Sequence, residues 1–169
     1  MKSEYLTAYN LLIQNLQELI LGYRDLYEIV LEEFEILIGA DREKLEQNNI
    51  KKEKIILHLQ HLDQDRQKIA YHFSPVQSKE LLRLLQIADL LGGQEANLLR
   101  EAHSTLDTLI RRIAEKNKSN AEYAESALKT LNGALGNVKE TLSGKKTYER
   151  KGGYKQGPDV SGNFISKNV

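Results

Sequence analysis

Apolar residues recur over the first 38 positions of the chain at alternating steps of three and four. The series runs through Leu6, Tyr9, Ile13, Leu16, Ile20, Tyr23, Tyr27, Val30, Phe34 and Leu37. This heptad a/d spacing places its members on the side of an α-helix that faces a partner helix. Leu12, Leu19 and Leu26 widen the same side at the adjoining g position. The pattern predicts one helix over residues 3–38, roughly 50 Å long at about 1.5 Å per residue.

Turn and cap signals divide the chain further. Gly39-Ala40-Asp41 ends the first helix, and Asp41 can cap a second helix over residues 42–73. Ser74-Pro75 ends that helix, because the residue before a proline is disfavoured in the α region. Ser78 is expected to cap a short helix, which Gly92-Gly93 closes. These short connections predict an all-α fold, an elongated antiparallel bundle of long, coiled-coil-like helices.

Polar residues interrupt the apolar stripes at two places. In the second helix they are Asn48, Asn49, Lys51 and Lys52, and we expect this first half to be poorly buried or bent. In the last helix, predicted over residues 94–142, the seam passes through Asn117 and Asn120. A buried amide at a seam position costs stability and typically fixes register or joins a polar network. The other reading is that the helix leaves the core here.

The second half of the last helix carries a separate apolar stripe at the same alternating spacing. Its members are Leu128, Leu131, Leu135, Val138 and Leu142. Gly133 and Gly136 lie within this stretch, and each costs about 1 kcal/mol of helix stability relative to alanine. We expect residues 121–143 to fray when unbound and to bind a partner helix. Packing of the stripe on the protein's own bundle, or on a second copy, has nearly equal weight from periodicity alone.

The C-terminal residues have a different composition. Residues 144–169 contain five of the eleven glycines, one proline and no apolar periodicity. Six basic residues against two acidic ones give this stretch a charge of +4. The pattern is typical of a flexible tail. We therefore expect a helical bundle over residues 1–143 and a flexible basic tail over residues 144–169.

Composition excludes several classes of function. The chain has 169 residues, no cysteine, and 24 basic side chains balanced by 24 acidic ones. The missing cysteines exclude disulfides, thiolate zinc sites and thiol nucleophiles. A net charge of zero removes global attraction to nucleic acid. No apolar run approaches the roughly 18 to 20 residues of a membrane span, and the first residues do not resemble a secretory signal. We expect a soluble cytoplasmic protein that does not insert into membranes.

Candidate chemistry is sparse. His58, His61 and Asp65 fall on neighbouring turns of one helix, where a metal site is geometrically conceivable. A bundle metal site usually draws ligands from several facing helices, so surface histidines are the favoured interpretation. The sequence contains no glycine-rich phosphate loop, nucleophile elbow or Glu-x-x-His motif. We therefore predict no enzymatic activity, no cofactor and no metal.

Five short motifs follow one another along the chain. An acidic stretch closes the first helix as Leu31-Glu32-Glu33-Phe34-Glu35-Ile36-Leu37-Ile38, and the next helix opens as Gly39-Ala40-Asp41-Arg42-Glu43-Lys44-Leu45-Glu46. A Lys-Glu-Lys segment follows as Lys52-Glu53-Lys54-Ile55-Ile56. The last helix contains Asn117-Lys118-Ser119-Asn120-Ala121, and the tail has Tyr148 before Gly152 and Gly153. In this order the motifs resemble the FlgN family of flagellar export chaperones, although Ala121 replaces the family's glycine.

The resemblance implies a non-catalytic cytoplasmic chaperone that holds hook–filament junction proteins before type III export. By position, the grip on the C-terminal helices of these hook-associated clients falls on Leu128, Leu131, Leu135, Val138 and Leu142. Docking on the cytoplasmic domain of the export gate falls on Tyr148, with Tyr154 as the competing residue. The alternative is a dimeric coiled-coil adaptor without a client, in which the same stripe joins two copies of the chain into a homodimer.

Overall fold

The computed structural model describes residues 3–74 and 82–142. These residues form four helices and no strand: α1 (Ser3–Ile38), α2 (Arg42–Tyr71), α3 (Leu84–Leu91) and α4 (Gly93–Leu142). The predicted all-α class is therefore confirmed. The three long helices begin and end within two residues of the predicted positions. Ser78, which was expected to cap α3, and the tail at 144–169 lie outside the described residues.

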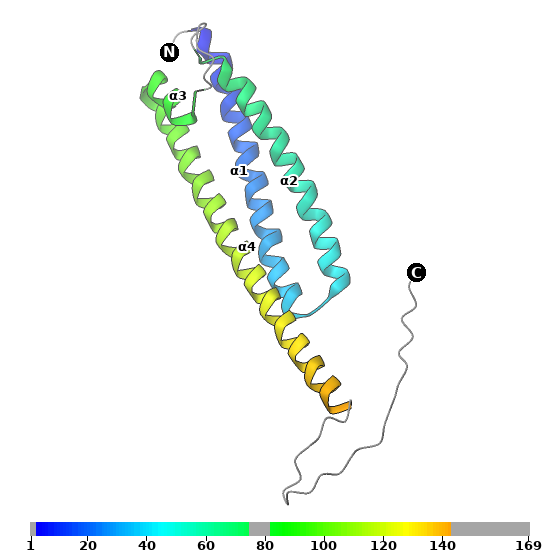
Figure 1. Cartoon of the computed structure of the whole chain (residues 1–169). Coiled ribbons are helices and arrows are strands. Elements are labelled where there is room, and N and C mark those ends of the chain that lie inside the picture. Colours follow the sequence, from blue (N-terminus) through cyan, green and yellow to red (C-terminus); the bar gives the residue numbers. More distant parts are fainter. Residues whose placement is uncertain (1–2, 75–81, 143–169) are drawn as a thin grey trace, which may run out of the picture. The chain divides into compact units, whose positions relative to one another are not determined.

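The chain divides into two compact units, Met1–Glu122 and Tyr123–Val169. In the first unit, α1 and α2 form an antiparallel hairpin, and residues 93–122 of α4 run beside α1 (Figure 1). A helix of 36 residues, such as α1, is about 54 Å long. The first unit is thus an elongated antiparallel bundle, as the heptad pattern predicts. None of the helices in the described ranges is long and apolar enough to cross a membrane.

The turn between α1 and α2 is made by the three residues that the sequence singles out. The Gly39 amide donates to the Glu35 carbonyl oxygen at 3.0 Å, and Ala40 adopts a positive φ of 49°. The Asp41 carboxylate then accepts a hydrogen bond from the Lys44 amide at 3.0 Å. This contact caps one of the free N–H groups at the start of α2. The predicted Asp cap is confirmed.

The side of α1 that is buried in the core differs from the side that the a/d series predicts. Leu12, Leu19 and Leu26, expected beside the seam, are among the most buried side chains, whereas Leu6, expected on it, is 47% exposed. The physical reason is that α1 packs against both α2 and α4, so its buried side is centred between two contact lines. The core also contains Phe73 and side chains of α3 and α4.

One glycine allows α1 and α2 to approach closely. A Cβ atom added at Gly22 would lie 2.8 Å from Cδ2 of Leu59. Leu59 is only 5% exposed and belongs to the hydrophobic core. Its side chain therefore occupies the space that the absent side chain of Gly22 leaves.

Candidate partner-binding site

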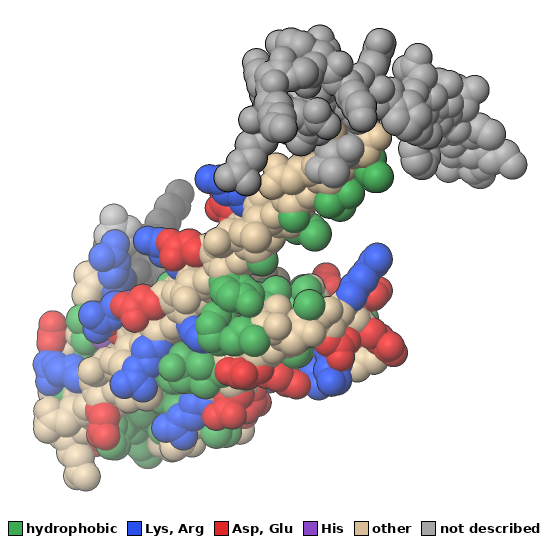
Figure 2. Space-filling model, turned by 90° about the horizontal axis from the view of Figure 1, so that it is seen from below, with side chains coloured by type: hydrophobic (Ala, Val, Ile, Leu, Met, Phe, Trp, Pro, Cys, Tyr) green, Lys and Arg blue, Asp and Glu red, His purple; other side chains and the backbone are tan. Residues whose placement is uncertain are grey.

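The second unit presents a row of uncovered apolar side chains. Residues 123–142 are helical in the structure, and the predicted stripe lies along this helix. Figure 2 shows hydrophobic side chains gathered along one side of the segment that leads to the grey residues. The exposed fractions are 57% for Leu128, 56% for Leu131, 57% for Leu135, 53% for Val138 and 76% for Leu142. Five large apolar side chains are thus available to a partner on one helical face.

The first unit contains a polar cluster at the position of the two seam asparagines. Lys52 on α2 donates from Nζ to both carboxylate oxygens of Glu33 on α1, at 3.1 and 2.9 Å. The same ammonium donates to Oδ1 of Asn117 at 2.9 Å. Nδ2 of Asn120 donates to Oε2 of Glu33 at 2.8 Å and to the Val30 carbonyl oxygen at 2.9 Å. We call Glu33, Lys52, Asn117 and Asn120 the polar junction, because it joins α1, α2 and α4.

The polar junction is largely removed from solvent. The Glu33 and Lys52 side chains are 13% and 19% exposed, and Asn120 is 3% exposed. Of the two readings of the asparagines, the polar network is therefore confirmed. A network of this kind costs desolvation energy and fixes the register between helices.

Two other buried asparagines also donate from Nδ2 to a backbone carbonyl oxygen of another helix, as Asn120 does. Nδ2 of Asn15 on α1 donates to the Leu62 carbonyl oxygen of α2 at 2.9 Å, and Nδ2 of Asn48 donates to the Ile29 carbonyl oxygen at 3.2 Å. Asn48 is 1% exposed, so the expectation of a poorly buried first half of α2 is wrong at this position. Asn49 and Lys51 are exposed, as expected. The expectation fails at Asn48 because its side chain pairs with a backbone carbonyl of α1, a partner that hydrophobic periodicity does not show.

Three of the motifs quoted above meet in the polar junction. Glu33 comes from the acidic end of α1, Lys52 from the Lys-Glu-Lys segment, and Asn117 and Asn120 from the motif in α4. The sequence predicts the role of the asparagines but misses their charged partners. The sequence signal for this cluster was the set of motifs itself. The motifs include all four residues but do not show that these residues are in contact.

The neighbouring residues strengthen the contact between α1 and α4. Nζ of Lys116 lies 3.7 Å from the centre of the Phe34 ring. A cation held over an aromatic face at this distance is attracted by the ring quadrupole. Lys116 and Asn120 thus hold α4 to α1, while Asn117 between them contacts Lys52 of α2.

The histidines that raised the question of a metal lie on the surface. His58 and His61 are exposed, and the carboxylate of Asp65 accepts a hydrogen bond from Lys68 at 2.7 Å. This bond, together with the Lys68 charge, holds the pKa of Asp65 below its ordinary value of 3.8. Within residues 3–74 and 82–142, no group of three metal-ligating side chains is found.

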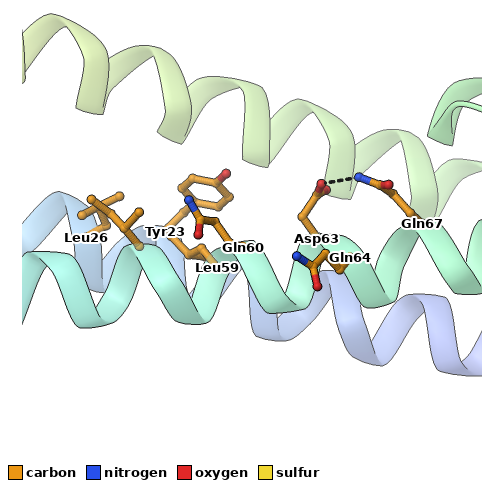
Figure 3. A pocket seen from close by; sticks show the side chains of 8 residues that line it. Tyr23, Leu26, Leu59, Gln60, Asp63, Gln64 and Gln67 are labelled. Atoms are coloured by element: carbon orange, nitrogen blue, oxygen red, sulfur yellow. Dashed lines mark hydrogen bonds between the residues drawn. The ribbon is translucent and has the colours of Figure 1, made fainter.

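A pocket of about 520 Å³ opens between α1 and α2 near the middle of the first unit (Figure 3). Tyr23 and Leu26 of α1 line it together with Gln60 and Asp63 of α2. Burial raises the pKa of Tyr23, and the nearby Asp63 carboxylate raises it further. Both carboxylate oxygens of Asp63 are bound, Oδ1 to Arg66 and Oδ2 to Gln67, each at 2.8 Å. Two of the polar side chains that line this pocket, Asp63 and Gln67, are therefore paired with each other.

The two tail tyrosines, Tyr148 and Tyr154, lie outside the described residues. Their assignment to export-gate docking stays a prediction. The structure places the five stripe residues on one exposed face, and their role in client binding stays a prediction.

Comparison with known proteins gives one result. The sequence model of a protein family, described as FlgN protein, matches residues 1–156 of the chain. This range includes all four described helices and reaches into the tail. No match to the chain was found among curated proteins or among solved structures.

Proposed function

Because this chain belongs to the FlgN family of flagellar export chaperones, we propose that its clients are the hook–filament junction proteins. In this proposal the chain binds the C-terminal amphipathic helix of a junction protein in the cytoplasm and delivers it to the export gate. Family membership makes the chain a chaperone of flagellum biogenesis that binds flagellar proteins, from a family that is not one of enzymes. The identity of the client and the delivery step are the proposed parts.

The exposed stripe is the observation that supports client binding. Leu128, Leu131, Leu135, Val138 and Leu142 repeat at alternating steps of three and four and are each more than half exposed. This spacing matches the anchors of an amphipathic helix that packs against another helix. A client helix with its own apolar face would cover these side chains and would lose the surface through which it assembles.

This function requires no covalent bond to be made or broken. A holding chaperone must cover apolar surface and later release it, and both steps depend on affinity alone. An exposed apolar helix face supplies the attraction. The first unit supplies a stable base, because its own helices are joined by a packed core and by the polar junction.

Delivery to the export gate is proposed for the tail. Tyr148 is the proposed docking residue for the cytoplasmic domain of the gate, and Tyr154 is the competing one. The two can be separated by measuring gate binding of Tyr148→Ala and Tyr154→Ala variants of the full chain, since neither change alters the net charge.

The client proposal is tested by Leu131→Gln with Leu135→Gln, because glutamine keeps helix propensity and net charge while removing apolar surface. Fully burying a leucine is worth about 1.5 to 3 kcal/mol, and these two side chains have 56% and 57% of their surface left to bury. The pair should therefore cost about 2 to 3 kcal/mol of binding, or about 30- to 150-fold in Kd. The measurement is titration calorimetry with a peptide of the client's C-terminal helix.

A charged variant and a matched control complete the experiment. Leu131→Asp with Leu135→Asp should abolish binding and leave the melting temperature of the bundle nearly unchanged. Ser126→Asp with Thr130→Asp adds the same charge at the same spacing on another exposed face of the helix, and should preserve binding. A large fall in melting temperature for the Leu→Asp pair would show that the stripe is core and would overturn the proposal.

Sedimentation distinguishes the adaptor alternative. A homodimer joined through the stripe would dissociate on truncation to residues 1–127 and would bind no client peptide. A chain that binds the peptide with one-to-one stoichiometry supports the chaperone proposal.

A further inference from the structure

Gly133 and Gly136 lie inside the helical segment 123–142, where neither the packing nor the backbone conformation requires a glycine. Apart from the adjoining residues and the backbone of its own helix, a Cβ atom added at either position would meet no atom within 4 Å. Gly22 differs, because its missing side chain admits Leu59 at 2.8 Å. Gly92 differs as well, because its φ of 69° belongs to the left-handed region that favours glycine. Neither close packing nor backbone conformation requires the two glycines of the second unit.

Their positions on the helix also separate them from the proposed grip. Gly133 follows Leu131 by two residues, and Gly136 precedes Val138 by two. Residues two apart are turned about 160° away from each other around an α-helix and do not share a face. A client helix lying along the stripe would therefore not approach these glycines closely.

The remaining physical effect of the two glycines is on the stability of the helix itself. Glycine is the least favourable residue in a helix interior apart from proline, since it loses the most backbone freedom on ordering. Helices of about 20 residues depend on packing for most of their stability, and every stripe side chain of this segment is more than half exposed. The segment therefore forms its helix with little support.

We propose that Gly133 and Gly136 set the affinity and the lifetime of the chaperone–client complex, an inference that rests on the proposed function. The bound complex must keep residues 123–142 in the helical conformation that the structure shows, and the glycines raise the entropic cost of keeping the backbone there. The attraction of five apolar anchors is thereby weakened to a reversible interaction. Client release then proceeds by spontaneous dissociation, without an energy-consuming step.

The test is Gly133→Ala with Gly136→Ala in the full-length chain. Each alanine should tighten binding of the client-helix peptide by up to about fivefold, and both together by up to about 25-fold. The gain should be found mainly in a slower dissociation rate. Hydrogen exchange of the free protein should show greater protection of residues 123–142 than in the unmodified chain. An unchanged Kd despite greater protection would overturn the proposal.

A series at Gly133 separates helix propensity from contact with the client. Affinity should decrease in the order Gly133→Ala, Gly133→Gln, Gly133→Asn and unmodified glycine, which is the order of helix propensity. Weaker binding by every side chain, and weakest by the largest, would instead show that the client packs on the glycine face. That result would also overturn the proposal.

Failure of this inference can be told apart from failure of the client assignment. If the unmodified chain binds the peptide and Leu131→Gln with Leu135→Gln weakens binding by about 30-fold or more, the proposed function stands whatever the glycine variants do. If the unmodified chain does not bind the peptide, the client assignment fails, and this inference fails with it.

Discussion

The ion pair in the polar junction allows a quantitative test of how the first unit is held together. Lys52→Met removes the ammonium group and keeps most of the apolar stem. The Glu33 carboxylate, 13% exposed, would then keep only the Nδ2 donor of Asn120 at 2.8 Å. Oδ1 of Asn117 would lose the 2.9 Å bond from Lys52. One change therefore leaves a largely buried charge and a carbonyl oxygen without their cation.

The size of the effect follows from this geometry. Breaking a fully buried ion pair by removing one partner costs about 3 to 5 kcal/mol. Since 13% and 19% of the two side chains remain exposed, water can reach the carboxylate in part, and we expect about 2 to 3 kcal/mol. For a unit of about 120 residues this loss lowers the melting temperature by about 6 to 15 °C. Thermal and urea unfolding of the full-length chain, followed by circular dichroism, measures both quantities.

A double-mutant cycle isolates the interaction between the two charges. Glu33→Gln combined with Lys52→Met should cost less than the sum of the single changes, by about 1 to 2 kcal/mol. Asp65 and Lys68 provide the control pair, with an N–O distance of 2.7 Å but exposed fractions of 56% and 74%. Their coupling should stay below about 0.5 kcal/mol, as for other exposed pairs. Equal coupling energies in the two cycles would refute the argument that burial strengthens the interaction between Glu33 and Lys52.

Two further predictions concern α1 and the start of α2. Gly22→Val should destabilise the first unit by about 1 to 3 kcal/mol through overpacking and so lower its melting temperature, because Leu59, whose Cδ2 atom lies 2.8 Å from the added Cβ, is buried in the core. Gly133→Val, where the added atoms have open space, should not lower it. Asp41→Ala should also lower it at neutral pH, since the Lys44 N–H bonds that hold the pKa of Asp41 below 3.8 stabilise the folded carboxylate. A lowered native pKa gives stability that is present above pH 3.8 and is lost as the pH falls through the native value, so the difference between the two proteins should shrink in acid. A difference that stays constant from pH 7 to well below pH 3.8 would contradict the cap as its source.

Local signals in the sequence identified the helices and their ends. Asp41 acts through Lys44, three residues further on, and Gly92 acts through its own positive φ, so the effect of both can be recognised without the fold. The exposed stripe in α4 could be recognised for the same reason, since alternating steps of three and four place its members on one face of any α-helix. Its role in client binding stays a prediction.

Contacts between distant residues could not be recognised in the same way. Hydrophobic periodicity predicts Leu6 on the seam and Leu12 beside it, but packing of α1 against two helices reverses their burial. Asn48 interrupts an apolar stripe, and yet it is almost fully buried, because its partner is a backbone carbonyl 19 residues away. No pattern within α2 contains that information.

The sequence by itself thus determined the helical class, the helix boundaries and the amphipathic face of the last helix, because propensity, capping and periodicity depend on neighbouring residues. The tertiary structure decided which polar residues are buried and what each of them binds. It brought Glu33 within hydrogen-bond distance of Lys52 and of Asn120, which is 87 residues away in the chain. The hydrogen bonds and the ion pair offset the cost of desolvating these groups only when all three helices are in register. The register is a property of the packed bundle and cannot be read from any one segment.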